Sequence, residues 1–204
     1  SSGAKCIGVD PATNVTKTIN HSDIKLYDDC FTEKLSIKIK EEEGYMDGIV
    51  SCYSFAHIDD MDSVMRGVIN ILKNKGVFIF ELYSLGTLID NMQYDNFYHE
   101  HMSYYSIKTL QIFLGKYKME IFDIKFFPRI RSGATRFYVK YANNSNRKIT
   151  KRFNSFLLEE ERKGHYKLKT LMQYSKRVKK TKINLIKLLE KLKTNGKKIA
   201  GYGA

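Results

Sequence analysis

The chain has 204 residues, of which 43% are hydrophobic, and a formal net charge of +13, so we expect one substantial core and exclude a disordered protein. No apolar run approaches the roughly 20 residues that span a bilayer, which predicts no membrane segment. The three cysteines form no CxxC pair, so we expect no disulfide framework and no metal site, and a reducing, cytoplasmic compartment.

The first half of the chain alternates apolar strands with helical patterns. Short apolar runs predict strands at 5–9 and 46–52, separated by a weakly patterned helix and an apolar stretch at 24–26. Apolar residues at helical spacing predict a helix over 59–74. Residues 77–82 form a continuous apolar strand of the kind that is buried on both faces of a parallel sheet. This order predicts a doubly wound α/β sheet.

The pattern changes in the second half. Residues 107–117 are helical, and then 119–127 and 134–141 alternate like strands, which predicts an antiparallel hairpin at the edge of the sheet. A long charged helical stretch follows over 152–193, and Gly164 is expected to break it.

The positive charge lies in one part of the chain. Residues 147–198 hold 18 Lys/Arg against 4 acids, while the rest holds 17 against 18. Because few aromatic residues interleave with these charges, we expect a solvated helix face rather than a nucleic-acid site. We therefore divide the chain into a domain at 1–146, a basic helical connector at 147–196, and the first strand and glycine turn of another α/β domain at 197–204.

The densest group of polar residues, Asn96–Ser106, follows the strand at 77–82. Active sites of open α/β sheets lie beyond the carboxyl ends of their strands, so a substrate is expected here. Histidine is the side chain best suited to exchange a proton at physiological pH, so His99 and His101 suit proton abstraction next to a carbonyl. The alternative is that both are ordinary loop residues. His57 and Tyr53, at the preceding strand end, are further candidates for the same pocket.

Four blocks in this order resemble a known family. The run Tyr98-His-Glu-His-Met-Ser-Tyr-Tyr-Ser106 is preceded by Phe55–Asp60 and Gly76–Glu81 and followed by Gly201–Ala204. Together they are similar to the nucleotide-sugar C-methyltransferases that use S-adenosylmethionine, of the 4-keto deoxysugar C-3-methyltransferase type. The resemblance implies a Rossmann-like class I methyltransferase fold.

The resemblance also implies roles for single residues. His101 matches the general base, and Glu100 and Tyr98 match the residues that support the substrate and its enolate. His99 falls at a variable position. On the cofactor side, Asp10 matches the carboxylate that binds the ribose of S-adenosylmethionine, and three residues match the strand end beside its adenosine and methionine parts: Ser51, Tyr53 and Phe55.

The family's glycine-rich cofactor block would lie upstream of Ser1, so we expect the chain to be a central fragment. Two alternatives stay open. The first is a catalytically impaired, methyltransferase-like protein that holds RNA or a protein partner. The second is a methyltransferase for another small molecule or for nucleic acid, with the same fold.

Overall fold

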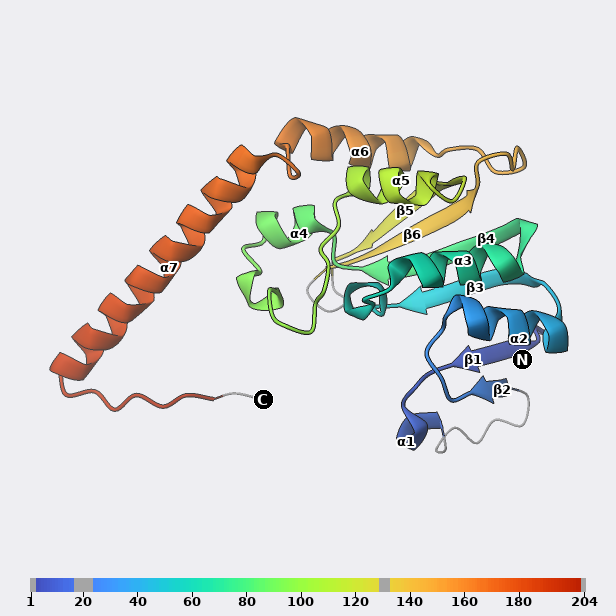
Figure 1. The fold of residues 1–204 in the computed structure, drawn as a ribbon. Helices are drawn as coiled ribbons and strands as arrows, with labels where there is room; N and C mark the ends of the chain where they lie inside the picture. Colours follow the sequence, from blue (N-terminus) through green and yellow to red (C-terminus); the bar gives the residue numbers. More distant parts are fainter. Residues whose placement is uncertain (1–2, 17–23, 129–132, 203–204) are drawn as a thin grey trace.

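The computed structural model describes residues 3–16, 24–128 and 133–202, and its strands form two sheets (Figure 1). The smaller sheet pairs β1 (Cys6–Val9) in parallel with β2 (Ile24–Tyr27). The larger sheet has the order β3-β4-β6-β5, with bounds Met46–Cys52 for β3, Leu72–Leu82 for β4, Met119–Phe127 for β5 and Ala134–Tyr141 for β6. β3 and β4 are parallel, and the antiparallel pair β5–β6 joins β4 through β6. The predicted α/β class and the edge hairpin are confirmed.

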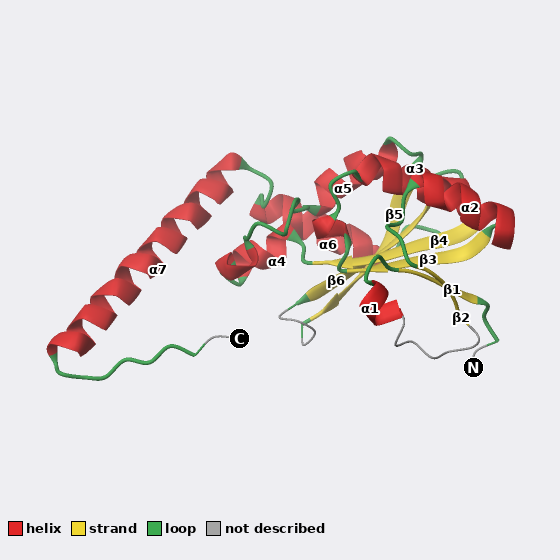
Figure 2. Ribbon diagram, turned by 60° about the horizontal axis from the view of Figure 1, so that its bottom comes forward, coloured by secondary structure: helices red, strands yellow, loops and turns green. Residues whose placement is uncertain are grey.

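Helices connect and cover these strands (Figure 2). Their bounds are Thr13–Thr16 for α1, Glu33–Glu43 for α2, Met61–Ile71 for α3, Leu85–Asp90 for α4, Ile107–Gly115 for α5, Lys151–Lys163 for α6 and Leu168–Thr194 for α7. Two single-turn 3-10 helices, η1 (Phe55–His57) and η2 (Tyr94–Asn96), lie in the loops after β3 and α4.

One hydrophobic core joins α3, α5 and α6 to the larger sheet. At its centre Phe80 of β4 is fully buried and stacks on Phe55 at 4.4 Å and on Phe137 at 5.1 Å between ring centroids. Stacked aromatic rings of this kind bury large apolar areas and fix the backbone that carries them. The carboxyl end of β4 is therefore packed between η1 and β6.

A smaller core lies under α2. Its buried members are Tyr27, Leu35, Ile39 and Ile71, and side chains of β1 and β3 pack against it. The two sheets thus share apolar contacts, although within the described chain β1 pairs only with β2 and β3 only with β4.

Two local expectations differ from the structure. The helix predicted to run to Asn74 ends at Ile71, because the chain from Leu72 onward pairs with β3, and tertiary pairing outweighs helix propensity. Helix α2 was not predicted, although its signals are in the sequence. Thr32 caps its first turn by accepting from the Leu35 amide, and Gly44 ends it at φ 79°.

The break predicted at Gly164 is confirmed. Gly164 takes a left-handed conformation at φ 63° and its amide bonds back to the carbonyls of Glu160 and Glu161, which ends α6 before α7 begins. Residues 197–202 have no regular secondary structure, so the strand predicted there is not formed, since no described strand lies beside it for pairing. Gly203 and Ala204 lie outside the described residues. None of the described helices is both long and apolar enough to cross a membrane.

Candidate active site

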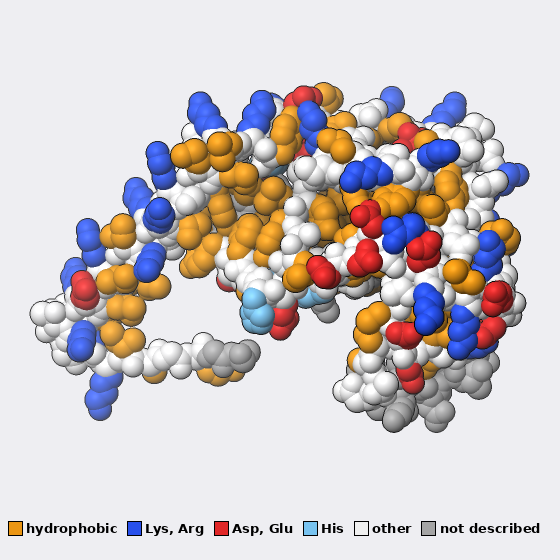
Figure 3. Space-filling view, viewed as in Figure 1, with side chains coloured by type: hydrophobic (Ala, Val, Ile, Leu, Met, Phe, Trp, Pro, Cys, Tyr) orange, Lys and Arg blue, Asp and Glu red, His pale blue; other side chains and the backbone are white. Residues whose placement is uncertain are grey.

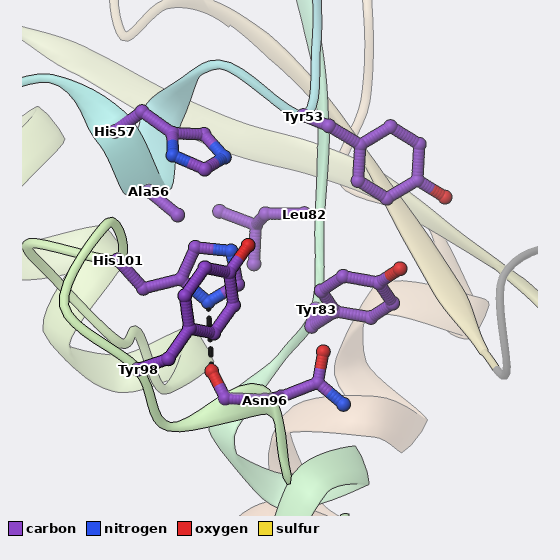
Figure 4. A pocket seen from close by; sticks show the side chains of 8 residues that line it. All are labelled: Tyr53, Ala56, His57, Leu82, Tyr83, Asn96, Tyr98 and His101. Carbon is purple, nitrogen blue, oxygen red and sulfur yellow. Dashed lines mark hydrogen bonds between the residues drawn. The ribbon is translucent and has the colours of Figure 1, made fainter. Parts of the chain in front are cut away.

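A cavity of about 140 Å³ opens where β3 and β4 end. Its walls come from three segments: the turn after β3 with η1, the end of β4 with the next residue, and the end of η2 with the loop that leads to α5. The lining residues are Tyr53, Ala56, His57, Leu82, Tyr83, Asn96, Tyr98 and His101. Figure 4 shows His57, His101 and Tyr98 on one side of the cavity and Tyr53 and Tyr83 on the other.

Backbone hydrogen bonds hold the loop 97–105 against the sheet. The Met102 amide donates to the Ala56 carbonyl at 2.7 Å, which ties the loop to η1. The Leu85 amide donates to the Tyr105 carbonyl at 2.8 Å, which ties the end of the loop to the start of α4. Buried or tethered backbone of this kind loses conformational freedom, so His101 is presented by a fixed segment.

The tautomer of His101 follows from its neighbour. Its Nδ1 lies 2.8 Å from the backbone carbonyl oxygen of Asn96 (Figure 4). A carbonyl oxygen can only accept, so Nδ1 carries the hydrogen of the neutral imidazole and Nε2 keeps its lone pair. A half-buried imidazole on the cavity wall thus has a nitrogen able to accept a proton.

His57 is held in the same way. Its Nδ1 lies 3.0 Å from the carbonyl oxygen of Glu100, so Nε2 is again the acceptor. The rings of His57 and His101 meet edge to face at 4.8 Å between centroids. His57 and Tyr53, which the sequence indicated as further candidates for the pocket, both line the cavity.

Of the three residues matched to catalysis, two line the cavity and one does not. The ring of Tyr98 lies 4.3 Å from that of His101, and both line the cavity. Glu100 contributes its carbonyl to His57, but its side chain is exposed and does not line the cavity. His99 is also exposed and outside the cavity. The structure therefore brings together Tyr98 and His101, and leaves the Glu100 carboxylate apart.

Asp10 stands directly after β1, on the exposed side of a strand end. Its amide donates to the Tyr27 carbonyl at 3.1 Å, and its Oδ1 accepts from the Ala12 amide at 2.8 Å. A carboxylate offers about four acceptor positions, so Asp10 can also accept from a vicinal diol. These acceptor positions fit the two ribose hydroxyls of S-adenosylmethionine.

The residues matched to the rest of the cofactor differ in exposure. Tyr53 lines the cavity with its ring 5.4 Å from Tyr83, and its backbone takes the uncommon φ of 58°. Such positive φ values in residues other than glycine cluster at functional sites. The hydroxyl of Ser51 pairs with that of Ser54 at 2.8 Å. The ring of Phe55 is fully buried in the core, so only its backbone is left to face a ligand.

Two lining side chains, and the backbone carbonyl of a third residue, had no signal in the sequence. Leu82 and Tyr83 belong to the end of a core strand, where an apolar or aromatic residue predicts packing. Asn96 acts through its carbonyl, which every residue type carries, so no side-chain pattern indicates it.

Two family models match successive parts of the chain. A family model described as a methyltransferase domain matches residues 1–121, and one described as a C-methyltransferase C-terminal domain matches residues 129–204. The C-methyltransferase NovU of Streptomyces niveus is 26% identical over 202 residues, covering 99% of this chain and 48% of NovU. The chain thus spans about half the length of this curated relative.

Solved structures of low sequence identity are also similar. A putative S-adenosylmethionine-dependent methyltransferase from Listeria monocytogenes is 16% identical with a TM-score of 0.49, over 68% of this chain and 81% of that one. A SAM-dependent methyltransferase from Anabaena variabilis is 15% identical with a TM-score of 0.48, over 66% of this chain and 67% of that one.

Proposed function

This chain belongs to the family of S-adenosylmethionine-dependent methyltransferases, and we propose that the protein methylates a carbon atom of a nucleotide-linked 4-keto deoxysugar. The observation that carries the proposal is the imidazole of His101, which faces a cavity at the strand ends with Nδ1 bound to a carbonyl and Nε2 able to accept a proton. The likeness to NovU supports transfer to carbon.

The proposed reaction begins with a carbon acid. A keto group acidifies the neighbouring C–H, and His101 Nε2 takes that proton while the electron pair of the C–H bond moves toward the keto oxygen as an enolate. A positioned general base contributes about 10²- to 10⁴-fold to such a step. The resulting imidazolium still donates from Nδ1 to the Asn96 carbonyl, so the ring need not move. The ring of Tyr98 lies 4.3 Å from that of His101, so its hydroxyl is the phenol that we propose for the enolate oxygen.

S-adenosylmethionine, when bound, supplies an electrophilic methyl group on its sulfonium centre. Asp10 would hold the ribose, and Ser51, Tyr53 and the backbone of Phe55 would line the adenosine and methionine parts. Asp10, Tyr53 and Phe55 follow the carboxyl ends of parallel strands, and Ser51 lies at the end of β3, where ligands of open α/β sheets bind. Reaction by a carbanion needs no metal ion.

The cavity is smaller than the roughly 300 Å³ at which sites for whole drug-sized ligands begin, so we propose that it encloses the sugar ring and leaves the nucleotide outside. The methyltransferase domain would comprise 1–146, with 147–196 as connector and 197–204 as the start of a further α/β domain. The three cysteines are free thiols, and we propose a cytoplasmic location, because thiols stay reduced there.

Methyl transfer tests the proposal directly. The chain, extended at its amino terminus by the expected glycine block, is incubated with S-adenosylmethionine and a nucleoside-diphosphate 4-keto-deoxysugar. We expect a product with a new methyl group on carbon, identified by its carbon–carbon coupling in NMR. Methylation of an oxygen atom, or of RNA and not the sugar under the same conditions, would show that the proposed substrate class is wrong.

Asp10→Ala is expected to weaken S-adenosylmethionine binding to the extended chain by roughly 1.5 to 3 kcal/mol, because hydrogen bonds to a charged acceptor are lost. Calorimetry measures the change. Asp47→Ala, at an exposed position near the amino-terminal end of β3, is the matched control and should leave the affinity as it is. Equal affinity of the Asp10→Ala and wild-type proteins would remove Asp10 from the cofactor site.

The basic helix α7 gives a prediction about RNA. It carries nine Lys/Arg and a single acid, and Figure 3 shows the cations along its outer side and apolar side chains along the side toward the body. We expect single-stranded RNA to bind weakly, with affinity falling steeply as salt rises, because only phosphate contacts are available. Fluorescence anisotropy across a salt series measures this. Tight, salt-resistant or sequence-selective binding would favour the alternative of an RNA-binding protein.

A further inference from the structure

We propose that Tyr104 is a positioning residue that holds His101 in its proton-accepting tautomer, acting through the backbone carbonyl of Asn96. The inference rests on the proposed function in one respect, namely that His101 is the base. The arrangement of the loop is independent of any substrate.

The Asn96 carbonyl oxygen accepts two hydrogen bonds. One comes from His101 Nδ1 at 2.8 Å and the other from the Tyr104 hydroxyl at 3.0 Å. The same hydroxyl accepts from the Tyr98 amide at 3.3 Å. The phenol therefore joins both ends of the segment that carries His101, and it fixes the peptide whose oxygen determines which ring nitrogen holds the hydrogen.

Tyr104 is itself held by packing. Its ring stacks on Phe97 at 4.4 Å between centroids, and Phe97 contacts Tyr174 of α7 at 5.8 Å. Burial raises the pKa of Tyr104, so the phenol keeps its proton and continues to donate to the carbonyl. The long helix, expected from sequence as a connector only, thus supports the loop from outside.

Removing the Tyr104 hydroxyl shows what it contributes to the loop. Without it the Asn96 carbonyl retains only the His101 hydrogen bond, and the peptide after Asn96 loses its link to residue 104. The imidazole can then rotate or exchange its hydrogen to Nε2. A ring with hydrogen on Nε2 cannot take a proton from a carbon on that side, so part of the population becomes inactive.

Tyr104→Phe removes the hydroxyl and keeps the stacking ring, and NMR of the chain reads the outcome without a substrate. Long-range nitrogen–proton correlations of the imidazole distinguish the two tautomers. We expect one neutral form of His101, with hydrogen on Nδ1, in the wild-type chain and a mixture in Tyr104→Phe. Tyr94→Phe, an exposed tyrosine in the same segment, is the matched control and should keep the wild-type spectrum.

A kinetic test measures the rate at which a 4-keto nucleotide sugar exchanges its carbon-bound hydrogen in deuterated water. We expect Tyr104→Phe to lower the maximal rate roughly 5- to 20-fold, as for loss of one hydrogen bond that orients the base, with little change in KM. Tyr174→Ala should lower it less, and Tyr174→Phe should match wild type.

The two hypotheses fail separately. A Tyr104→Phe chain with a single Nδ1–H tautomer and the wild-type exchange rate would overturn the positioning function of Tyr104. A wild-type chain that catalyses no exchange, but shows the tautomer change on Tyr104→Phe, would leave the positioning intact and overturn the function proposed for the base.

Discussion

His101→Asn is expected to lower both exchange of the sugar's carbon-bound hydrogen and methyl transfer by about 10²- to 10⁴-fold, the range that a general base contributes. Asparagine preserves polarity near the Asn96 carbonyl but has no nitrogen that can accept a proton. Rates are measured by NMR for exchange and by mass spectrometry for methylation. Cofactor affinity should not change, because the substitution leaves the residues proposed for the adenosine part in place.

His99→Asn is the matched control. His99 is exposed and lies outside the cavity, so the loss should be much smaller. Equal losses for the two histidines would indicate a structural pair rather than a base and its neighbour. Full activity of His101→Asn would end the assignment of the base.

Glu160→Ala is expected to lower the free energy of unfolding by about 2 to 4 kcal/mol, the largest change in stability predicted for a polar residue here. The buried Glu160 carboxylate of α6 accepts from the amides of Ile107 at 2.7 Å and Lys108 at 2.9 Å, in the first turn of α5. Alanine leaves both amides without this partner and removes a negative charge from the positive end of a helix. Urea unfolding followed by circular dichroism measures the change.

Glu161→Ala is the control for Glu160, since Glu161 is adjacent and exposed. Its substitution should change stability by no more than about 0.5 kcal/mol. Because α5 begins where the loop of His101 ends, Glu160→Ala should also increase the mobility of that loop. Equal stability of the two variants would show that α5 does not depend on the carboxylate.

The strands were predictable because their patterns are strong. Val77–Leu82 is apolar except for Glu81, and the strands at 119–127 and 134–141 alternate on either side of a turn. The bounds of β5 and β6 agree with the prediction, and β4 ends at Leu82 as predicted but begins earlier, at Leu72. The end of α3 was not predictable, because the helical spacing of apolar residues continues to Leu72 and the pairing of β4 with β3 decides where the helix stops. The order β3-β4-β6-β5 likewise depends on contacts far apart in the sequence.

The site was predictable in its residue types and not in its geometry. Histidines and tyrosines concentrated after a sheet strand indicated the correct loop, and His57, Tyr53, Tyr98 and His101 line one cavity. The sequence could not indicate that the Glu100 side chain is exposed or that the Phe55 ring is in the core. Nor could it indicate the Asn96 carbonyl, because backbone groups carry no pattern of their own.

Exchange of the hydrogen next to the keto group, catalysed by the wild-type chain in deuterated water without S-adenosylmethionine, tests the central hypothesis most directly. Proton removal by His101 precedes methyl transfer in the proposed reaction, so it requires the cavity but not bound S-adenosylmethionine. The hypothesis predicts deuterium at the carbon beside the keto group of a 4-keto nucleotide sugar, at a rate well above that without protein. No incorporation above that background, with the sugar shown to be bound, would contradict it.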